Sequence, residues 1–103
     1  MLLAIDCGNT NTVFAVYDGD TQCGQWRIAT HAQRTSDEYA VWLTQLMSLR
    51  GLSVEDISQA IVTTVVPGTR HNLTNLLESH FGVTPLVVRD PNVDLGIEVL
   101  IER

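Results

Sequence analysis

The sequence of 103 residues predicts one α/β domain that begins with antiparallel strands and continues with alternating strands and helices. Two observations support this prediction. Three apolar or β-branched segments separated by turn formers occupy residues 2–29, and segments with helical spacing alternate with apolar strand segments over residues 35–88. A hydrophobic content of 45% is typical of a protein with a packed core.

The first 29 residues predict a three-stranded antiparallel meander. Residues Leu2–Ile5 form the first expected strand, and Thr12–Tyr17 ("TVFAVY") forms a second that is almost entirely apolar. Asp18-Gly19 is typical of a tight hairpin turn, and Gln22–Ala29 is the third expected strand.

A helix is expected next, because Thr35 and Glu38 form a capping-box pattern and Asp37 adds negative charge at the helix N-terminus. Gly51 is the expected end of this helix. Its apolar stripe consists of Tyr39, Trp42, Leu43, Leu46 and Met47. We expect the stripe to pack in the core. An aromatic-lined ligand site is the alternative.

The second half predicts parallel strands joined by crossover helices. Ala60–Val66 is the next expected strand, and it is stopped by Pro67-Gly68. A helix over Thr69–His80 follows and ends before Gly82, and Val83–Val88 is a further strand. The inward residues expected for this helix are Leu73, Leu76 and Leu77.

Residues 90–103 contain turn formers and then the strand-like segment "LGIEVLIER", which has no partner after it. We therefore expect the chain to be the N-terminal part of a longer protein.

Charge and composition exclude several functions. Twelve acids against six bases give a net charge of −6, so we expect no binding to nucleic acid or to anionic lipid. All six bases are arginines, and without lysine a P-loop phosphate site is excluded. No apolar run approaches the roughly 20 residues that span a membrane, so a cytoplasmic location is expected.

The two cysteines, Cys7 and Cys23, are expected to be free thiols, because the chain shows no sign of secretion. A zinc site that used them with His31 would lack a fourth ligand.

The stretch "AIDCGNTNTVFAVYDGD" (residues 4–20) carries more polar groups than a hairpin needs. We expect Gly8 and Asn9 to supply the positive φ of a turn. On one interpretation, Asp6 caps this turn and the threonines favour the strand. On the other, backbone amides and hydroxyls bind a phosphate chain, and Asp6 holds a magnesium ion, because a bare carboxylate would repel phosphate.

Several further segments share a pattern with one enzyme family. The segments "DCGNT", "WRIAT", "RTSDEY" and "TTVVP" resemble the N-terminal half of type III pantothenate kinases, which belong to the superfamily of acetate and sugar kinases, Hsp70 and actin. "FGVTPLVV" and "LGIEV" continue the likeness over the whole chain. The resemblance implies a ribonuclease H-like (actin-like ATPase) fold for residues 1–103 as an N-terminal nucleotide-binding domain, with the second domain of the family absent.

The first phosphate-binding motif of that family is Asp-x-Gly-Asn-Thr-x-x-x, and this chain matches all its fixed positions. The resemblance implies ATP and phosphate contacts by the eight residues Asp6, Cys7, Gly8, Asn9, Thr10, Asn11, Thr12 and Val13. Asp6 would also organise magnesium, with water molecules between them.

The resemblance implies that the full protein phosphorylates pantothenate with ATP, magnesium and a monovalent cation (potassium or ammonium), as a homodimer. The general base and a second phosphate motif are expected beyond Arg103, so this chain alone would be inactive. Asp90 and Asp94 are weak substitutes for the base. Two alternatives remain: a non-catalytic regulatory or interaction domain with the same fold, and another small-molecule kinase of the superfamily.

Overall fold

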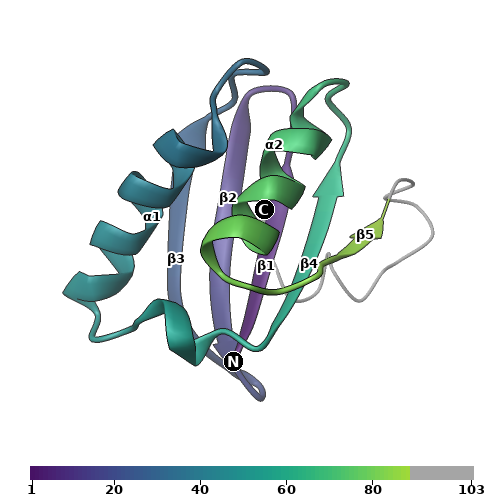
Figure 1. Ribbon diagram of the computed structural model, residues 1–103. Helices are drawn as coiled ribbons and strands as arrows, with labels where there is room; N and C mark the ends of the chain where they lie inside the picture. Colours follow the sequence, from purple (N-terminus) through teal and green to yellow (C-terminus); the bar gives the residue numbers. More distant parts are fainter. Residues whose placement is uncertain (89–103) are drawn as a thin grey trace.

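The computed structural model describes residues 1–88, which form a mixed five-stranded sheet with helices on one face (Figure 1). The strands are β1 (Leu2–Cys7), β2 (Asn11–Asp18), β3 (Thr21–Ala29), β4 (Gln59–Thr64) and β5 (Leu86–Val88), in the order β3-β2-β1-β4-β5. β1, β2 and β3 pair antiparallel, whereas β4 is parallel to β1 and to β5. The predicted α/β class, the meander and the parallel crossovers are confirmed.

Helices α1 (Ser36–Leu49) and α2 (Thr69–Asn75) cover the same face of this sheet. A short 3₁₀-helix, η1 (Val54–Asp56), leads into β4, and α2 continues as a π-helical segment, η2 (Leu76–His80). No helix among residues 1–88 is long and apolar enough to cross a membrane.

The capping box predicted for the first helix is present. The Glu38 N–H donates to Thr35 Oγ1 at 3.2 Å, and the Thr35 N–H donates to Glu38 Oε1 at 2.9 Å. These two bonds satisfy backbone donors that the first turn of a helix leaves without intrahelical partners. Gly51 follows the helix with a φ of +73°, a conformation that glycine adopts without strain.

The main core lies between the sheet and the helices. Leu3, Ile5, Phe14 and Val62 of the strands meet the inward side chains of α1, α2 and η2, which are Tyr39, Leu43, Met47, Leu73, Leu76 and Leu77. The Phe14 ring lies 5.7 Å from that of Tyr39 and 5.2 Å from that of Trp42, measured between centroids. Tyr39, Leu43 and Met47 of the predicted stripe are therefore core and Trp42 packs against it, with both rings on Phe14, whereas Leu46 is half-buried outside this core.

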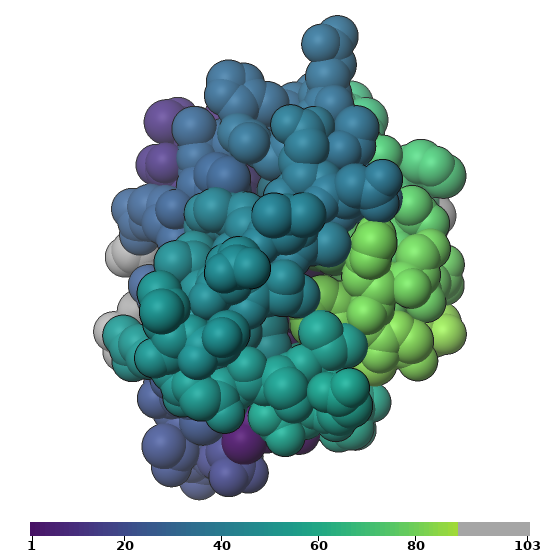
Figure 2. Space-filling view, turned by 60° about the vertical axis from the view of Figure 1, so that its left-hand side comes forward, coloured from purple at the N-terminus to yellow at the C-terminus, as the bar shows by residue number. Residues whose placement is uncertain are grey.

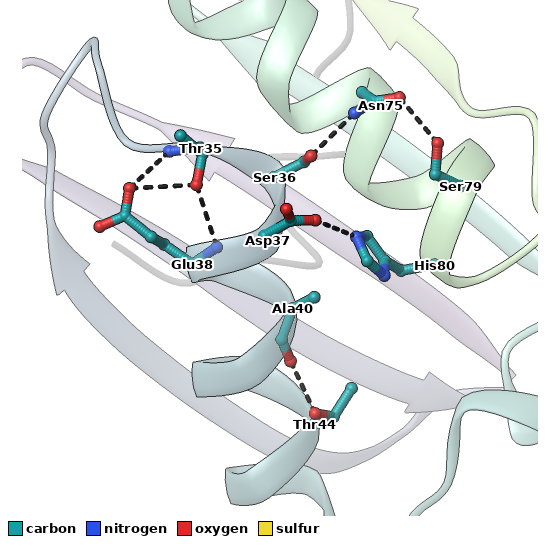
Figure 3. A network of polar contacts seen from close by, with 9 residues as sticks. All are labelled: Thr35, Ser36, Asp37, Glu38, Ala40, Thr44, Asn75, Ser79 and His80. Atoms are coloured by element: carbon teal, nitrogen blue, oxygen red, sulfur yellow. Dashed lines mark hydrogen bonds and ion pairs between the residues drawn. The ribbon is translucent and has the colours of Figure 1, made fainter.

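Polar contacts join α1 to the α2–η2 segment, which lies beside it (Figure 2). The Asn75 amide donates to Ser36 Oγ at 2.8 Å, and Ser79 Oγ donates to Asn75 Oδ1 at 2.7 Å (Figure 3). One turn further along, His80 Nε2 lies 2.9 Å from Asp37 Oδ1. These contacts set the spacing of the two helices above the sheet.

Strand ends differ from the sequence prediction in all five strands. β1 extends to Cys7 and not only to Ile5, and β2, β3 and β4 each begin one residue earlier than predicted. Two strands are cut short. β4 ends at Thr64 and not at Val66, because β1 ends at Cys7 and its last carbonyl accepts from the Val65 N–H at 3.1 Å. β5 begins at Leu86 and not at Val83, because the Val83 N–H donates to the carbonyl of Leu77 at 3.0 Å. Pro85, which has no N–H to donate, follows.

The structure tests some of the remaining sequence predictions, and the others concern residues outside 1–88. The helix expected over Thr69–His80 has that span, although its second part is π-helical. Cys7 and Cys23 are free thiols, as predicted. The strand-like segment "LGIEVLIER", Asp90 and Asp94 lie outside the described residues.

Replacing Thr35 by alanine should lower the free energy of unfolding by about 1 kcal/mol, because the Glu38 N–H would lose its acceptor. Urea denaturation measures this change. Ser48→Ala is the matched control, since Ser48 lies exposed in the same helix. An equal stability of Thr35→Ala and the control would contradict the capping role.

Stability should also depend on pH through Glu38. Hydrogen bonds from the backbone and then the hydroxyl of Thr35 lower the pKa of this carboxyl from 4.5. A carboxyl with a lowered folded-state pKa contributes stability above its unfolded pKa and loses it as pH falls through the folded value. The stability difference between wild type and Glu38→Gln should therefore shrink as pH falls below about 4.5. A difference that stays constant from pH 7 to pH 3 would refute this.

Candidate active site

The predicted phosphate loop joins β1 to β2 at the end of the sheet where α2 also begins (Figure 1). The Gly8 N–H donates to the carbonyl of Asn11 at 2.9 Å and closes a tight turn. Asn9 and Thr10 are exposed at its tip. Their N–H groups make no hydrogen bond to any described residue, so both donors are open to a ligand.

Gly8 has a different role from the one its sequence suggested. We expected Gly8 and Asn9 to supply positive φ, but neither residue has it. The observed constraint is space, because a Cβ on Gly8 would lie 3.3 Å from the carbonyl oxygen of Asn11. The glycine therefore allows a close approach of two backbone segments.

Strand alternation separates the motif residues into two groups. Cys7 and Thr12 face the helices, whereas Asp6 and Val13 face the opposite side of the sheet. Asp6 is 5% exposed and pairs in register with Val13 of β2 and Thr63 of β4. The motif is thus contiguous in sequence but is not one surface.

On the helix side, a buried chain of hydroxyl and thiol groups lies beneath the loop. Thr12 Oγ1 lies 2.8 Å from Thr30 Oγ1 and 3.4 Å from Cys7 Sγ. Cys7 Sγ lies 3.6 Å from Thr69 Oγ1, which in turn lies 2.7 Å from Thr64 Oγ1. We call Thr30, Thr12, Cys7, Thr69 and Thr64 the hydroxyl–thiol chain. It connects the residue that follows β3 with β2, β1, α2 and β4 at one end of the sheet.

The protons of this chain can be assigned, because each hydroxyl carries only one. Thr30 donates to the Gly8 carbonyl at 2.8 Å and Cys7 donates to Thr69, so Thr12 is the donor both toward Thr30 and toward Cys7, and its single proton can serve only one of them at a time. Thr69 donates to the Val66 carbonyl at 2.8 Å and therefore accepts from its neighbours. Cys7 and Thr12 are both 0% exposed, so in this structure their side chains support the loop and do not reach its surface.

Tyr39 lies close to this chain. Its hydroxyl is near Thr12 and Arg34 but meets the geometry of a hydrogen bond with neither. Burial, and then the nearby Cys7, raise the pKa of the Tyr39 phenol above its usual value, and Arg34 opposes this shift. The phenol is therefore neutral at physiological pH. The sequence analysis placed Tyr39 in the helix core and did not predict that its hydroxyl would lie near Thr12 and Arg34.

On the opposite side, a hollow of about 210 Å³ opens beside the loop and is lined by Asp6, Gly8, Asn11, Val13 and Arg27. It holds four of the eight predicted site residues together with Arg27, which the sequence prediction did not include. Larger hollows of about 340 and 370 Å³ lie along β4 and β5, and no acid is among the described residues that line either. Hollows of about 330 and 280 Å³ contain Glu55 and Glu38, but none of their described lining residues belongs to the loop. The hollow with Asp6 is the one whose groups suit a metal-associated phosphate.

The residues present fit a magnesium ion in one respect. Mg²⁺ on phosphate substrates needs only one or two carboxylates and keeps several waters, and Asp6 supplies one carboxylate to the hollow that Gly8 and Asn11 of the turn also line. No cluster of three or more potential metal ligands exists among residues 1–88, so a metal held entirely by protein is not supported there.

Comparison with known proteins decides the family. The family model for type III pantothenate kinase matches residues 2–103. The chain belongs to the type III pantothenate kinase family. The type III pantothenate kinase of Rhodospirillum rubrum is 60% identical over all 103 residues, and that of Rhodospirillum centenum is 57% identical over the same length.

The chain spans about 40% of the length of these two type III pantothenate kinases. Solved structures agree on the fold. YeaZ from Pseudomonas aeruginosa matches 86% of this chain and 43% of its own with a TM-score of 0.61 at 14% identity. A putative N-acetylglucosamine kinase from Porphyromonas gingivalis matches 85% of this chain and 33% of its own with a TM-score of 0.58 at 18% identity. The fold is therefore ribonuclease H-like, as the resemblance implied.

The hydroxyl–thiol chain leads to a stability prediction with an internal control. Thr12→Val should lower the free energy of unfolding by about 1 kcal/mol, because it removes the hydroxyl that bonds to Thr30 and donates to Cys7. Thr63→Val should be neutral or stabilising, because the Thr63 hydroxyl is 1% exposed and has no hydrogen-bond partner among the described residues.

Urea denaturation of both variants measures the two effects. Equal destabilisation of Thr12→Val and Thr63→Val would contradict the assignment, because the loss would then reflect the shape of valine and not the hydrogen bonds.

Proposed function

We propose that this chain is the ATP-phosphate-binding lobe of a pantothenate kinase. The full-length protein would transfer the γ-phosphoryl group of ATP to the 4′-hydroxyl of pantothenate, which yields 4′-phosphopantothenate and ADP at the first step of coenzyme A biosynthesis. The observation that carries this proposal is the turn with the open N–H groups of Asn9 and Thr10, whose Gly8 and Asn11 share a hollow with Asp6, in a chain of the type III pantothenate kinase family.

The turn has the chemistry that phosphate binding needs. The open N–H groups of Asn9 and Thr10 bind phosphate oxygens through oriented dipoles, and the exposed side chains of the same two residues add neutral donors. Phosphoryl transfer depends mainly on positioning and charge stabilisation, so donors fixed before the substrate arrives are effective. Cys7 and Thr12 contribute by holding the turn in place from the buried side.

Asp6 is the residue of this chain that would hold magnesium, through water. When bound, the ion neutralises charge on the phosphates as they react. Asp6 itself lies at the carboxyl-terminal half of the central strand, is paired on both sides, and therefore presents its carboxylate in a fixed direction.

The proposal leaves part of the reaction to residues outside this chain. The general base, the pantothenate contacts and the second phosphate motif belong there, together with a monovalent cation site. Homodimerisation and a cytoplasmic location are part of the same proposal. The 103 residues alone would bind nucleotide without turnover.

The test is ADP release by the full-length protein in the presence of ATP, magnesium, potassium and pantothenate. Release should require pantothenate, and acetate or sugars should not replace it. Release without pantothenate dependence, or with acetate or a sugar in its place, would refute the proposed substrate.

In the same assay, Asp6→Asn should lower kcat/KM by about 100-fold or more, because the amide cannot replace the charge of the carboxylate. Urea denaturation of the same variant separates a loss of activity from a loss of folding. Asp20→Asn, an exposed change in the β2–β3 turn, is the control and should keep full activity. An active Asp6→Asn enzyme would exclude the metal role.

A further inference from the structure

Arg27 lies in one row with Asp6 across three strands. Val13 of β2 pairs with Asp6 of β1 on one side and with Arg27 of β3 on the other. Directly paired residues in neighbouring strands face the same side of a sheet, so the three side chains share one face. Asp6 and Arg27 accordingly line the same hollow of about 210 Å³, beside Gly8 and Asn11 of the loop.

Among the described residues that line this hollow, Arg27 is the one cation and Asp6 is the one acid. The Arg27 side chain is exposed and makes no hydrogen bond or ion pair with any described residue. Its guanidinium is therefore free to bind an anion without breaking a structural contact.

The other arginines in the described part of the chain are placed differently. The Arg34 guanidinium lies over the Tyr39 ring at 5.8 Å and donates to the Ala29 carbonyl at 3.1 Å. Arg50 follows the last turn of α1, and Arg70 lines a separate hollow along β4 and β5. Because the chain has no lysine, Arg27 is the described cation that shares a hollow with the loop.

We propose that Arg27 binds the terminal phosphates of the magnesium nucleotide. This inference rests on the proposed function for the location of the nucleotide and adds a residue to it. A guanidinium donates two parallel hydrogen bonds to phosphate oxygens, and such charge-assisted bonds are about twice as strong as neutral ones. The arginine also offsets the repulsion between phosphate and Asp6 in a chain whose net charge is −6.

Three variants of the full-length protein test this assignment by calorimetric titration with MgATP and with AMP. Arg27→Gln should weaken binding of MgATP by about 10- to 100-fold and leave that of AMP within twofold, because AMP lacks the β- and γ-phosphates. Arg27→Lys should fall in between, since it retains the charge but loses the paired donors. Arg50→Gln is the control and should bind both nucleotides as the wild type does.

An unchanged affinity of Arg27→Gln for MgATP overturns the inference, and so does an equal loss for MgATP and AMP, which would indicate a distorted loop. Wild-type protein that binds no MgATP also overturns it. Failure of the proposed function looks different: the wild type would bind MgATP more tightly than Arg27→Gln but would release no ADP when pantothenate is added.

Discussion

The central position of β1 is the constraint on which the rest of the structure depends. It is antiparallel to β2 and parallel to β4, so its backbone is hydrogen-bonded on both sides and its register is fixed twice. A slip by one residue would move every side chain to the other face. Leu3 and Ile5 of the main core keep β1 from slipping, because they would lose their burial beneath the helices. The packing of Leu3 and Ile5 therefore determines which face of the sheet Asp6 points to.

The alternation of side chains between the two faces of the sheet, along β1 and β2, explains why one short motif serves two purposes. The residues that alternate toward the helices join a buried polar network, whereas those that alternate away face the hollow beside the loop. Threonines and a cysteine suit the buried side, because they are small and their polar atoms pair with one another. Through Thr69 the network also reaches the start of α2. The loop is thus held by the strands and by a helix, which keeps its backbone donors in place before a ligand binds.

Local patterns in the sequence sufficed for most of the fold. The capping box at Thr35 and the stripe that includes Tyr39 depend on spacing along one helix, and both were predicted correctly. The end of β4 and the start of β5 were not predicted correctly. The first depends on where β1 stops, and the second depends on the hydrogen bond from the Val83 N–H to the Leu77 carbonyl. Such contacts join residues that come together only in the folded chain, so spacing along one helix or strand does not predict them.

The sequence motif pointed to Asp6 and the turn as a candidate site. It did not separate Asp6 from Cys7, because the predicted first strand ended at Ile5, whereas β1 continues through both residues and turns them to opposite faces. Arg27 was missed because it is 21 positions from Asp6 in the sequence, and only the register of β2 with both neighbours brings the two together. The role of Gly8 was also misjudged, since the close approach of Asn11 depends on the shape of the whole turn.

The most direct test of this account is a crystal structure of the full-length protein with magnesium and a non-hydrolysable ATP analogue. The account predicts phosphate oxygens within hydrogen-bond distance of the Asn9 and Thr10 N–H groups, with the magnesium ion on the Asp6 side of the sheet. Phosphates bound elsewhere, or a metal ion separated from Asp6 by more than one water, would contradict it.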